Sequence, residues 1–166
     1  MLHLFDCDGV ILDSNNLKIK AVQETLNEIS YPEALIDIAI ENFRKNFGRT
    51  RLKHFQVFFE ILSNDKYFPE SQTDLHEAIK IYGDKVKALY LYSDIIPETY
   101  NFIKKIDKNN LFVVSASDQE ELRQVFLKNL PYIPIKNIFG GPESKSNNIQ
   151  FILSKKDTNN AILYGD

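Results

Sequence analysis

Residues 4–10 read Leu-Phe-Asp-Cys-Asp-Gly-Val, and the interpretation of the whole chain starts from this stretch. An apolar run that begins at Leu2 is typical of a buried strand, and it ends in two carboxylates, Asp6 and Asp8. Gly9 follows them and lets the chain turn away without a side chain. Side chains alternate along a strand, so both carboxylates are predicted to point to the same side. Two like charges so close favour a shared proton or a bound cation.

Composition limits the class of protein. A chain of 166 residues that is 43% hydrophobic can build one ordinary core with a small satellite domain. Its net charge of -3 gives no reason to expect nucleic acid or an anionic membrane as a partner. The single cysteine excludes an internal disulfide, and the histidines are too scattered for a zinc site. Because we find no membrane-length apolar run and no signal peptide, we expect a soluble, cytoplasmic protein.

Four amphipathic patterns follow the first strand. Apolar residues at helical spacing predict helices over about 17–29, 32–43, 52–62 and 73–91. No strand pattern lies between them. We therefore expect a small helical domain at residues 15–93, inserted after the first strand.

The remainder of the chain alternates between strand and helix. This alternation favours a parallel sheet with helices on both faces, formed by residues 1–14 and 94–166. In chain order we expect a helix from Pro97, a strand over 111–114 that stops at Ser115, a helix from about Asp118 to Asn129, a loop at 140–142, a helix over 145–155 and a strand over 161–164.

Several polar residues lie at or near the predicted carboxyl ends of the strands. Open parallel sheets bind their ligands at this edge, so these residues are candidates for a binding site. They are Asp6 with Asp8, Ser115, Lys145 and Asp166. In order and type they resemble the four motifs of the haloacid dehalogenase superfamily. The stretch LFDCDGVILDS resembles the first motif of its phosphatase and phosphomutase branches. The dehalogenase branch lacks the second aspartate, so its presence here points to phosphoryl transfer.

The resemblance implies a Rossmann-like parallel sheet with an inserted helical cap. It also implies a Mg²⁺-dependent phosphatase that hydrolyses a small phosphorylated metabolite through an aspartyl-phosphate. Asp6 would be the nucleophile and Asp8 the general acid and base. The metal ligands would be the Asp6 carboxylate, the Asp8 carbonyl and Asp166. Ser115 and the amides that follow it from Ala116 would bind phosphoryl oxygens.

Two basic features complete this interpretation. Lys145 would supply a fixed positive charge that stabilises the transition state. Within the helical insertion, the stretch Gly48-Arg49-Thr50-Arg51 lies in a predicted loop, where a cap of this type would contact substrate. We expect Arg51, helped by Arg49, to recognise a second anionic or hydroxyl-rich part of the substrate. The alternative for such a basic run is a solvated face.

Two alternatives stay open for the function. Ser115-Ala116-Ser117 resembles the β-phosphoglucomutase branch, in which a sugar instead of water accepts the phosphoryl group. The last motif of the family continues beyond Gly-Asp, whereas this chain ends at Asp166, so we expect a core truncated at its C-terminus. The second alternative is accordingly a catalytically inactive, truncated protein that only binds phosphate or a partner. In either case we expect a monomer or a weak homodimer.

Overall fold

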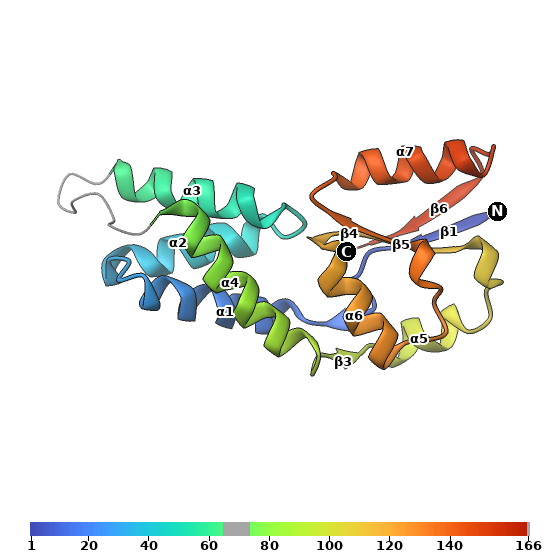
Figure 1. Cartoon of the computed structure of the whole chain (residues 1–166), viewed down its shortest axis with the longest axis horizontal. Helices are drawn as coiled ribbons and strands as arrows, with labels where there is room; N and C mark the ends of the chain where they lie inside the picture. The colour runs from blue at the N-terminus through green and yellow to red at the C-terminus, as the bar shows by residue number, and fades with distance from the viewer. Residues whose placement is uncertain (65–73, 166) are drawn as a thin grey trace. The chain divides into compact units, whose positions relative to one another are not determined.

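The computed structural model describes residues 1–64 and 74–165, and the chain divides into two compact units (Figure 1). The sheet unit contains Met1–Asn15 and Tyr90–Asp166, and the helical unit contains Asn16–Leu89. The helical unit is thus an insertion near the beginning of the sheet unit. From the sequence we placed the two boundaries after residues 14 and 93.

The sheet unit is built on a four-stranded parallel sheet in the order β5-β4-β1-β6. Strand β1 is central, with Leu4 opposite Phe112 of β4 on one side and Leu163 of β6 on the other. This arrangement confirms the predicted parallel α/β fold. The strands are β1 (Leu2–Phe5), β4 (Leu111–Asp118), β5 (Ile138–Gly141) and β6 (Ala161–Tyr164).

The end of β4 differs from the prediction. We expected the strand to stop at Ser115, but it continues to Asp118, which pairs with Gly141 after a register shift. The apolar pattern stops where the side chains become polar, whereas the backbone goes on pairing with β5. Gly140 permits this pairing, because a Cβ there would lie 2.5 Å from the carbonyl oxygen of Ser117. The predicted loop at 140–142 was therefore wrong for its first two residues.

Helices cover both faces of the sheet, with α7 on one face and α5 and α6 on the other (Figure 1). The first turns of the helices that begin at Gln119 and Lys145 are capped as the sequence suggests: Asp118 accepts the amides of Glu120 and Glu121 at 3.0 Å, and Ser144 accepts the amide of Asn147 at 3.1 Å. The helices are α5 (Pro97–Ile103), α6 (Gln119–Asn129) and α7 (Lys145–Lys155), and two short 3-10 turns are η1 (Lys108–Asn110) and η2 (Ile135–Asn137).

The core beneath α7 joins this helix to the sheet. Apolar side chains from β1, β4 and α7 pack against one another there and are buried. This packing stabilises the position of each strand end. The buried members of this core are Leu2, Leu4, Phe112, Val114 and Ile152.

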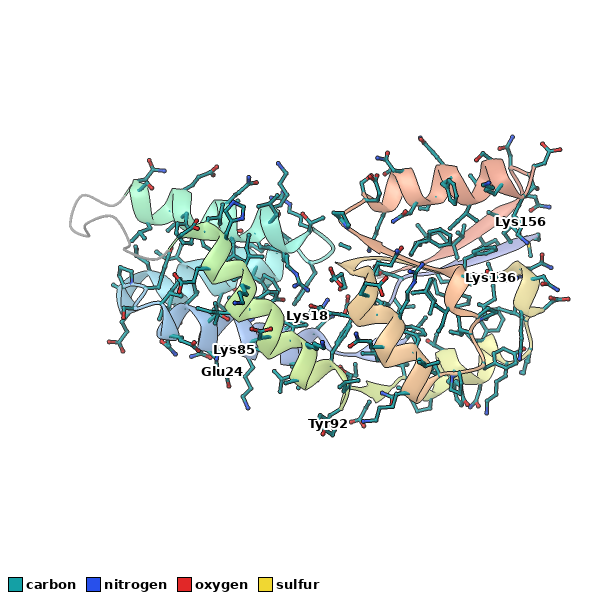
Figure 2. All side chains as sticks on the ribbon, viewed as in Figure 1. Lys18, Glu24, Lys85, Tyr92, Lys136 and Lys156 are labelled. Atoms are coloured by element: carbon teal, nitrogen blue, oxygen red, sulfur yellow. The ribbon has the colours of Figure 1, made fainter. Side chains whose placement is uncertain are left out.

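The helical unit contains the four expected helices, although residue 73, where we expected the last of them to begin, lies outside the described residues. An ion pair of 2.7 Å between Lys85 and Glu28 links the last helix to the first (Figure 2 labels Lys85). Aromatic side chains, among them Phe43, Phe55 and Phe58, are buried in the interior of the unit. The helices are α1 (Asn15–Glu28), α2 (Glu33–Lys45), α3 (Arg51–Ser63) and α4 (Leu75–Tyr90).

A short antiparallel ladder lies where the chain leaves the sheet unit and returns to it. Strand β2 (Leu12–Asp13) pairs with β3 (Asp94–Ile95), and Asp13 stands opposite Asp94. The amide of Ile96 extends the ladder by donating to the carbonyl of Ile11 at 2.9 Å. The sequence predicts no strand here, because two residues are too few to show an alternating pattern.

Candidate active site

Asp6 follows β1 directly, and its side chain is largely removed from solvent, with the residue only 7% exposed. Its carboxylate accepts the amide of Cys7 at 2.7 Å and forms an ion pair with the ammonium of Lys145. Burial raises the pKa of the Asp6 carboxyl, while the hydrogen bond and charge of Lys145 act in the opposite direction. The negative charge of Asp8 adds to the increase in the Asp6 pKa. The first residue of α7 therefore provides the counter-charge for a buried carboxylate.

Asp8 lies two residues further on, and four hydroxyl groups surround its carboxylate. Ser14 and Tyr90 each donate to Oδ1 at 2.6 Å. Ser117 donates to Oδ2 at 2.9 Å, and Ser115 does so at 3.4 Å. These donors come from three distant parts of the chain, so the fold holds this carboxylate in one orientation.

Ser115 is fully buried in β4 and also accepts the amide of Ser117 through its hydroxyl at 3.1 Å. Ala116 lies between them in the strand. The helix that follows, α6, begins at Gln119 with Asp118 as its N-cap, as the sequence predicts. The structure brings Ser115 together with Asp8, as the position of both residues at strand ends suggests.

The residues expected to recognise substrate in the helical unit surround the beginning of α3. Gly48 has a φ of 89°, a conformation that favours glycine, and Arg51 is the first residue of the helix. The Arg51 guanidinium lies 5.7 Å from the ring centroid of Tyr82. Arg49 lies in the loop between them. A role of these residues in substrate binding remains a prediction.

Magnesium is the predicted cofactor, and two of its three expected donors lie in the described part of the chain. Asp6 and the Asp8 carbonyl offer the hard oxygen donors that Mg²⁺ prefers. The raised pKa of Asp6 fits such a site, because a divalent cation would offset the cost of burying this carboxylate. Asp166 lies outside the described residues. Within residues 1–64 and 74–165, no group of three His, Cys, Asp or Glu is placed to hold a metal ion.

Sequence reasoning missed three neighbours of Asp8, namely Ser14, Tyr90 and Ser117. Tyr90 is separated from it by 82 residues and ends an amphipathic helix, where an aromatic residue looks like an ordinary core position. Ser14 lies in the quoted first motif, and that motif was the only available signal for it.

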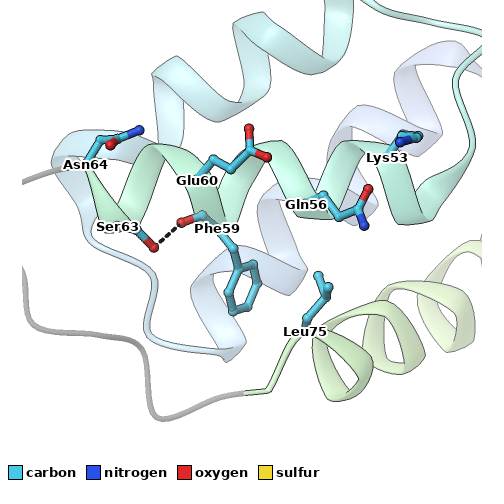
Figure 3. A pocket seen from close by; sticks show the side chains of 7 residues that line it. All are labelled: Lys53, Gln56, Phe59, Glu60, Ser63, Asn64 and Leu75. Atoms are coloured by element: carbon cyan, nitrogen blue, oxygen red, sulfur yellow. Dashed lines mark hydrogen bonds between the residues drawn. The ribbon is translucent and has the colours of Figure 1, made fainter.

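A separate groove of about 570 Å³ lies on the helical unit (Figure 3). None of the predicted site residues lines it. The residues that line it come from α3, from the position directly after α3 and from the start of α4. They are Lys53, Gln56, Phe59, Glu60, Ser63, Asn64 and Leu75.

Solved structures share this fold over nearly the whole chain. A predicted phosphoglycolate phosphatase from Haemophilus somnus aligns with a TM-score of 0.76 at 14% identity, over 99% of this chain and 76% of its own. CbbY from Rhodobacter sphaeroides, solved with phosphate and as a variant with xylulose-1,5-bisphosphate, gives TM-scores of 0.71 and 0.70 at 13% and 12% identity, over 98% of this chain and 76% of its own. The HAD-hydrolase YfnB from Bacillus subtilis, solved with magnesium, gives 0.63 at 16% identity, over 99% and 79%. These TM-scores establish a common fold, and at identities of 12–16% they establish the fold alone.

Comparison with curated proteins found no match. The family model of haloacid dehalogenase-like hydrolases matches residues 2–152, a range that runs from β1 into α7. It includes Asp6, Asp8, Ser115 and Lys145. The chain therefore belongs to the haloacid dehalogenase-like hydrolase family.

Proposed function

We propose that this chain is a phosphatase that hydrolyses a small phosphorylated metabolite through an aspartyl-phosphate on Asp6. The observation that carries the proposal is the pairing of buried Asp6 with Lys145 beside the hydroxyl-bound carboxylate of Asp8. Membership of a hydrolase family agrees with this chemistry. The structures solved with phosphate and with magnesium supply the ligand classes that the proposal requires.

In the first step, a carboxylate oxygen of Asp6 attacks phosphorus as the bond to the ester oxygen breaks. Asp8 gives its proton to the departing oxygen. In the second step, Asp8 takes a proton from water, which attacks the same phosphorus and releases inorganic phosphate. Asp6 regains its carboxylate, and both aspartates return to their starting states.

Charge stabilisation comes from the groups around these aspartates. Lys145 favours the ionised, nucleophilic form of Asp6 and offsets negative charge on the phosphoryl oxygens. The Ser115 hydroxyl and the backbone at Ala116 would bind those oxygens. To do so, the Ser115 hydroxyl would give up part of its present contact with Asp8 and with the Ser117 amide. Bound Mg²⁺, held by Asp6, the Asp8 carbonyl and Asp166, would neutralise further charge.

We propose a substrate of small size with a second polar group. Gly48, Arg49 and Arg51 would bind that group, and the bisphosphate bound by the CbbY variant is an example of such chemistry. The formal charge of -3 gives no electrostatic reason for a nucleic-acid partner. Within the part of the chain that the structure describes, every helix is too short or too polar to cross a membrane.

The experiment is to incubate the chain with Mg²⁺ and para-nitrophenyl phosphate and to measure phosphate release. We expect Asp6→Asn to reduce turnover by about 1,000-fold or more, because the nucleophile is lost. Asp13→Asn, on an exposed carboxylate of β2, is the matched control and should keep full activity. A folded wild-type chain that binds phosphate but releases none from esters would favour the phosphate-binding alternative.

A sugar-phosphate mutase is the second candidate, favoured by the Ser115-Ala116-Ser117 pattern. It shares the aspartyl-phosphate and differs in the acceptor. A mutase should require a bisphosphate to start turnover, whereas a phosphatase releases inorganic phosphate from simple esters unaided. Phosphate release measured with and without a sugar bisphosphate separates the two.

A further inference from the structure

Tyr90 makes the contact with Asp8 that sequence reasoning did not anticipate. It is the last residue of α4, and its side chain is almost completely buried. Its hydroxyl donates to Asp8 Oδ1 at 2.6 Å and lies 3.5 Å from the Cys7 sulfur. A thiol is a weak hydrogen-bonding group, so the carboxylate is the stronger partner for this hydroxyl.

We propose that Tyr90 is a positioning residue, which holds the Asp8 carboxylate in the orientation from which it transfers its proton to the leaving oxygen. This inference rests on the proposed function, in which Asp8 is the general acid. Proton transfer depends strongly on alignment of donor and acceptor, so a group that fixes the carboxylate plane contributes to the rate.

The four donors around Asp8 differ in how firmly they fix it. A serine hydroxyl rotates about one bond, and Ser14 and Ser115 each have a second neighbour besides Asp8. Ser14 Oγ lies 3.4 Å from the Leu12 carbonyl, and Ser115 Oγ accepts an amide of β4. The Tyr90 hydroxyl sits at the end of a rigid ring that is almost completely buried. It therefore holds Oδ1 in a fixed direction more firmly than a serine hydroxyl does.

The test compares two esters whose leaving groups differ in their need for a proton. Ethyl phosphate releases a poor leaving group that requires protonation, whereas para-nitrophenolate departs without it. For Tyr90→Phe in the full chain with Mg²⁺, we expect kcat for ethyl phosphate to fall by about 10- to 100-fold, as misalignment of a general acid predicts. The kcat for para-nitrophenyl phosphate should change by less than about threefold, with KM for both esters unchanged.

Tyr31→Phe is the matched control. Tyr31 is also a buried tyrosine with a donating hydroxyl, which bonds to the Phe58 carbonyl at 2.7 Å within the helical unit. It should leave the ratio of the two kcat values unchanged. In an Asp8→Asn background, Tyr90→Phe should produce no further loss with ethyl phosphate, because the group that it positions no longer carries an acidic proton.

Equal losses for both esters, or no loss for either, would overturn the positioning role. Circular dichroism at the assay temperature checks folding, and a Tyr90→Phe chain that does not fold would assign the hydroxyl to stability and also reject the proposal. If the wild-type chain hydrolyses neither ester, it is the proposed function that fails. If it hydrolyses both, the ratio of the two losses decides this inference alone.

Discussion

At the scale of single residues, His54 shows how burial suppresses ionisation. Its imidazole is 3% exposed, packs 4.4 Å from the ring of Phe43, and its Nδ1 finds no hydrogen-bond partner among the described residues. Burial, assisted by the positive charges of Arg49 and Lys18, lowers the pKa of His54 to about 4. The helical unit therefore holds this histidine neutral.

This histidine predicts a pH dependence of stability. In the unfolded chain its pKa returns to about 6.5, so the unfolded state binds more protons between that value and about 4. The contribution of neutral His54 to the free energy of unfolding is fully present above pH 6.5. It is lost as the pH falls towards 4, by up to about 3 kcal/mol. Urea unfolding at a series of pH values should show a flatter dependence for His54→Phe than for wild type. His76→Gln, on an exposed histidine of α4, should retain the wild-type slope.

Arg51 carries the prediction for substrate choice. We expect Arg51→Ala to lower kcat/KM for phosphoglycolate by about tenfold, because a charge-assisted hydrogen bond to its carboxylate would be lost. Hydrolysis of para-nitrophenyl phosphate, which has no second anionic group, should be nearly unchanged. Lys53→Ala, on an exposed lysine of the same helix, is the control. Equal effects of Arg51→Ala on both esters would contradict a recognition role.

The residues of the site were partly predictable from the sequence. Asp6, Asp8, Ser115 and Lys145 could be found because each follows or precedes an apolar pattern at the same edge of a parallel sheet. Tyr90 could not be found, because its contact with Asp8 depends on where a long helix ends in space, which local patterns do not encode.

At the scale of elements, the close approach of β5 to the end of β4 supports the site. We expect Gly140→Ala to destabilise the chain by about 1–3 kcal/mol, because its Cβ would overlap the Ser117 carbonyl. It should also lower kcat, because displacement of Ser117 and Ser115 would loosen the donors to Asp8. Gly165→Ala is the control, since no atom of the described residues, its chain neighbours aside, lies within 4 Å of a Cβ there. Thermal unfolding and turnover measure the two effects, and wild-type values for Gly140→Ala would contradict the argument.

The limits of element prediction follow from length. Helices of thirteen to sixteen residues such as α2, α3 and α4 show their periodicity clearly. The two-residue strands β2 and β3 show none, and the final residues of β4 are polar although they continue the ladder. Tertiary pairing decides these segments, so the local sequence does not predict them.

At the scale of the whole molecule, we expect the fold to tolerate removal of magnesium while activity does not. The ion pair between Lys145 and Asp6 supplies charge compensation from within the chain. EDTA should therefore reduce phosphate release by at least about 100-fold and leave the far-ultraviolet circular dichroism spectrum unchanged. Excess Mg²⁺ should restore turnover. Loss of secondary structure on chelation would show instead that the metal is required for folding.

The ladder between β2 and β3 has a consequence for how such a protein can diversify. Asp13 and Asp94 stand opposite each other in an antiparallel ladder. The inserted segment between them therefore begins and ends at neighbouring positions of one hairpin-like stem. A stem of this kind accepts a different insert without any change in the strands that hold the carboxylates. Selectivity can then evolve, or be engineered by transplanting residues 16–89, while the bond-breaking chemistry is inherited intact.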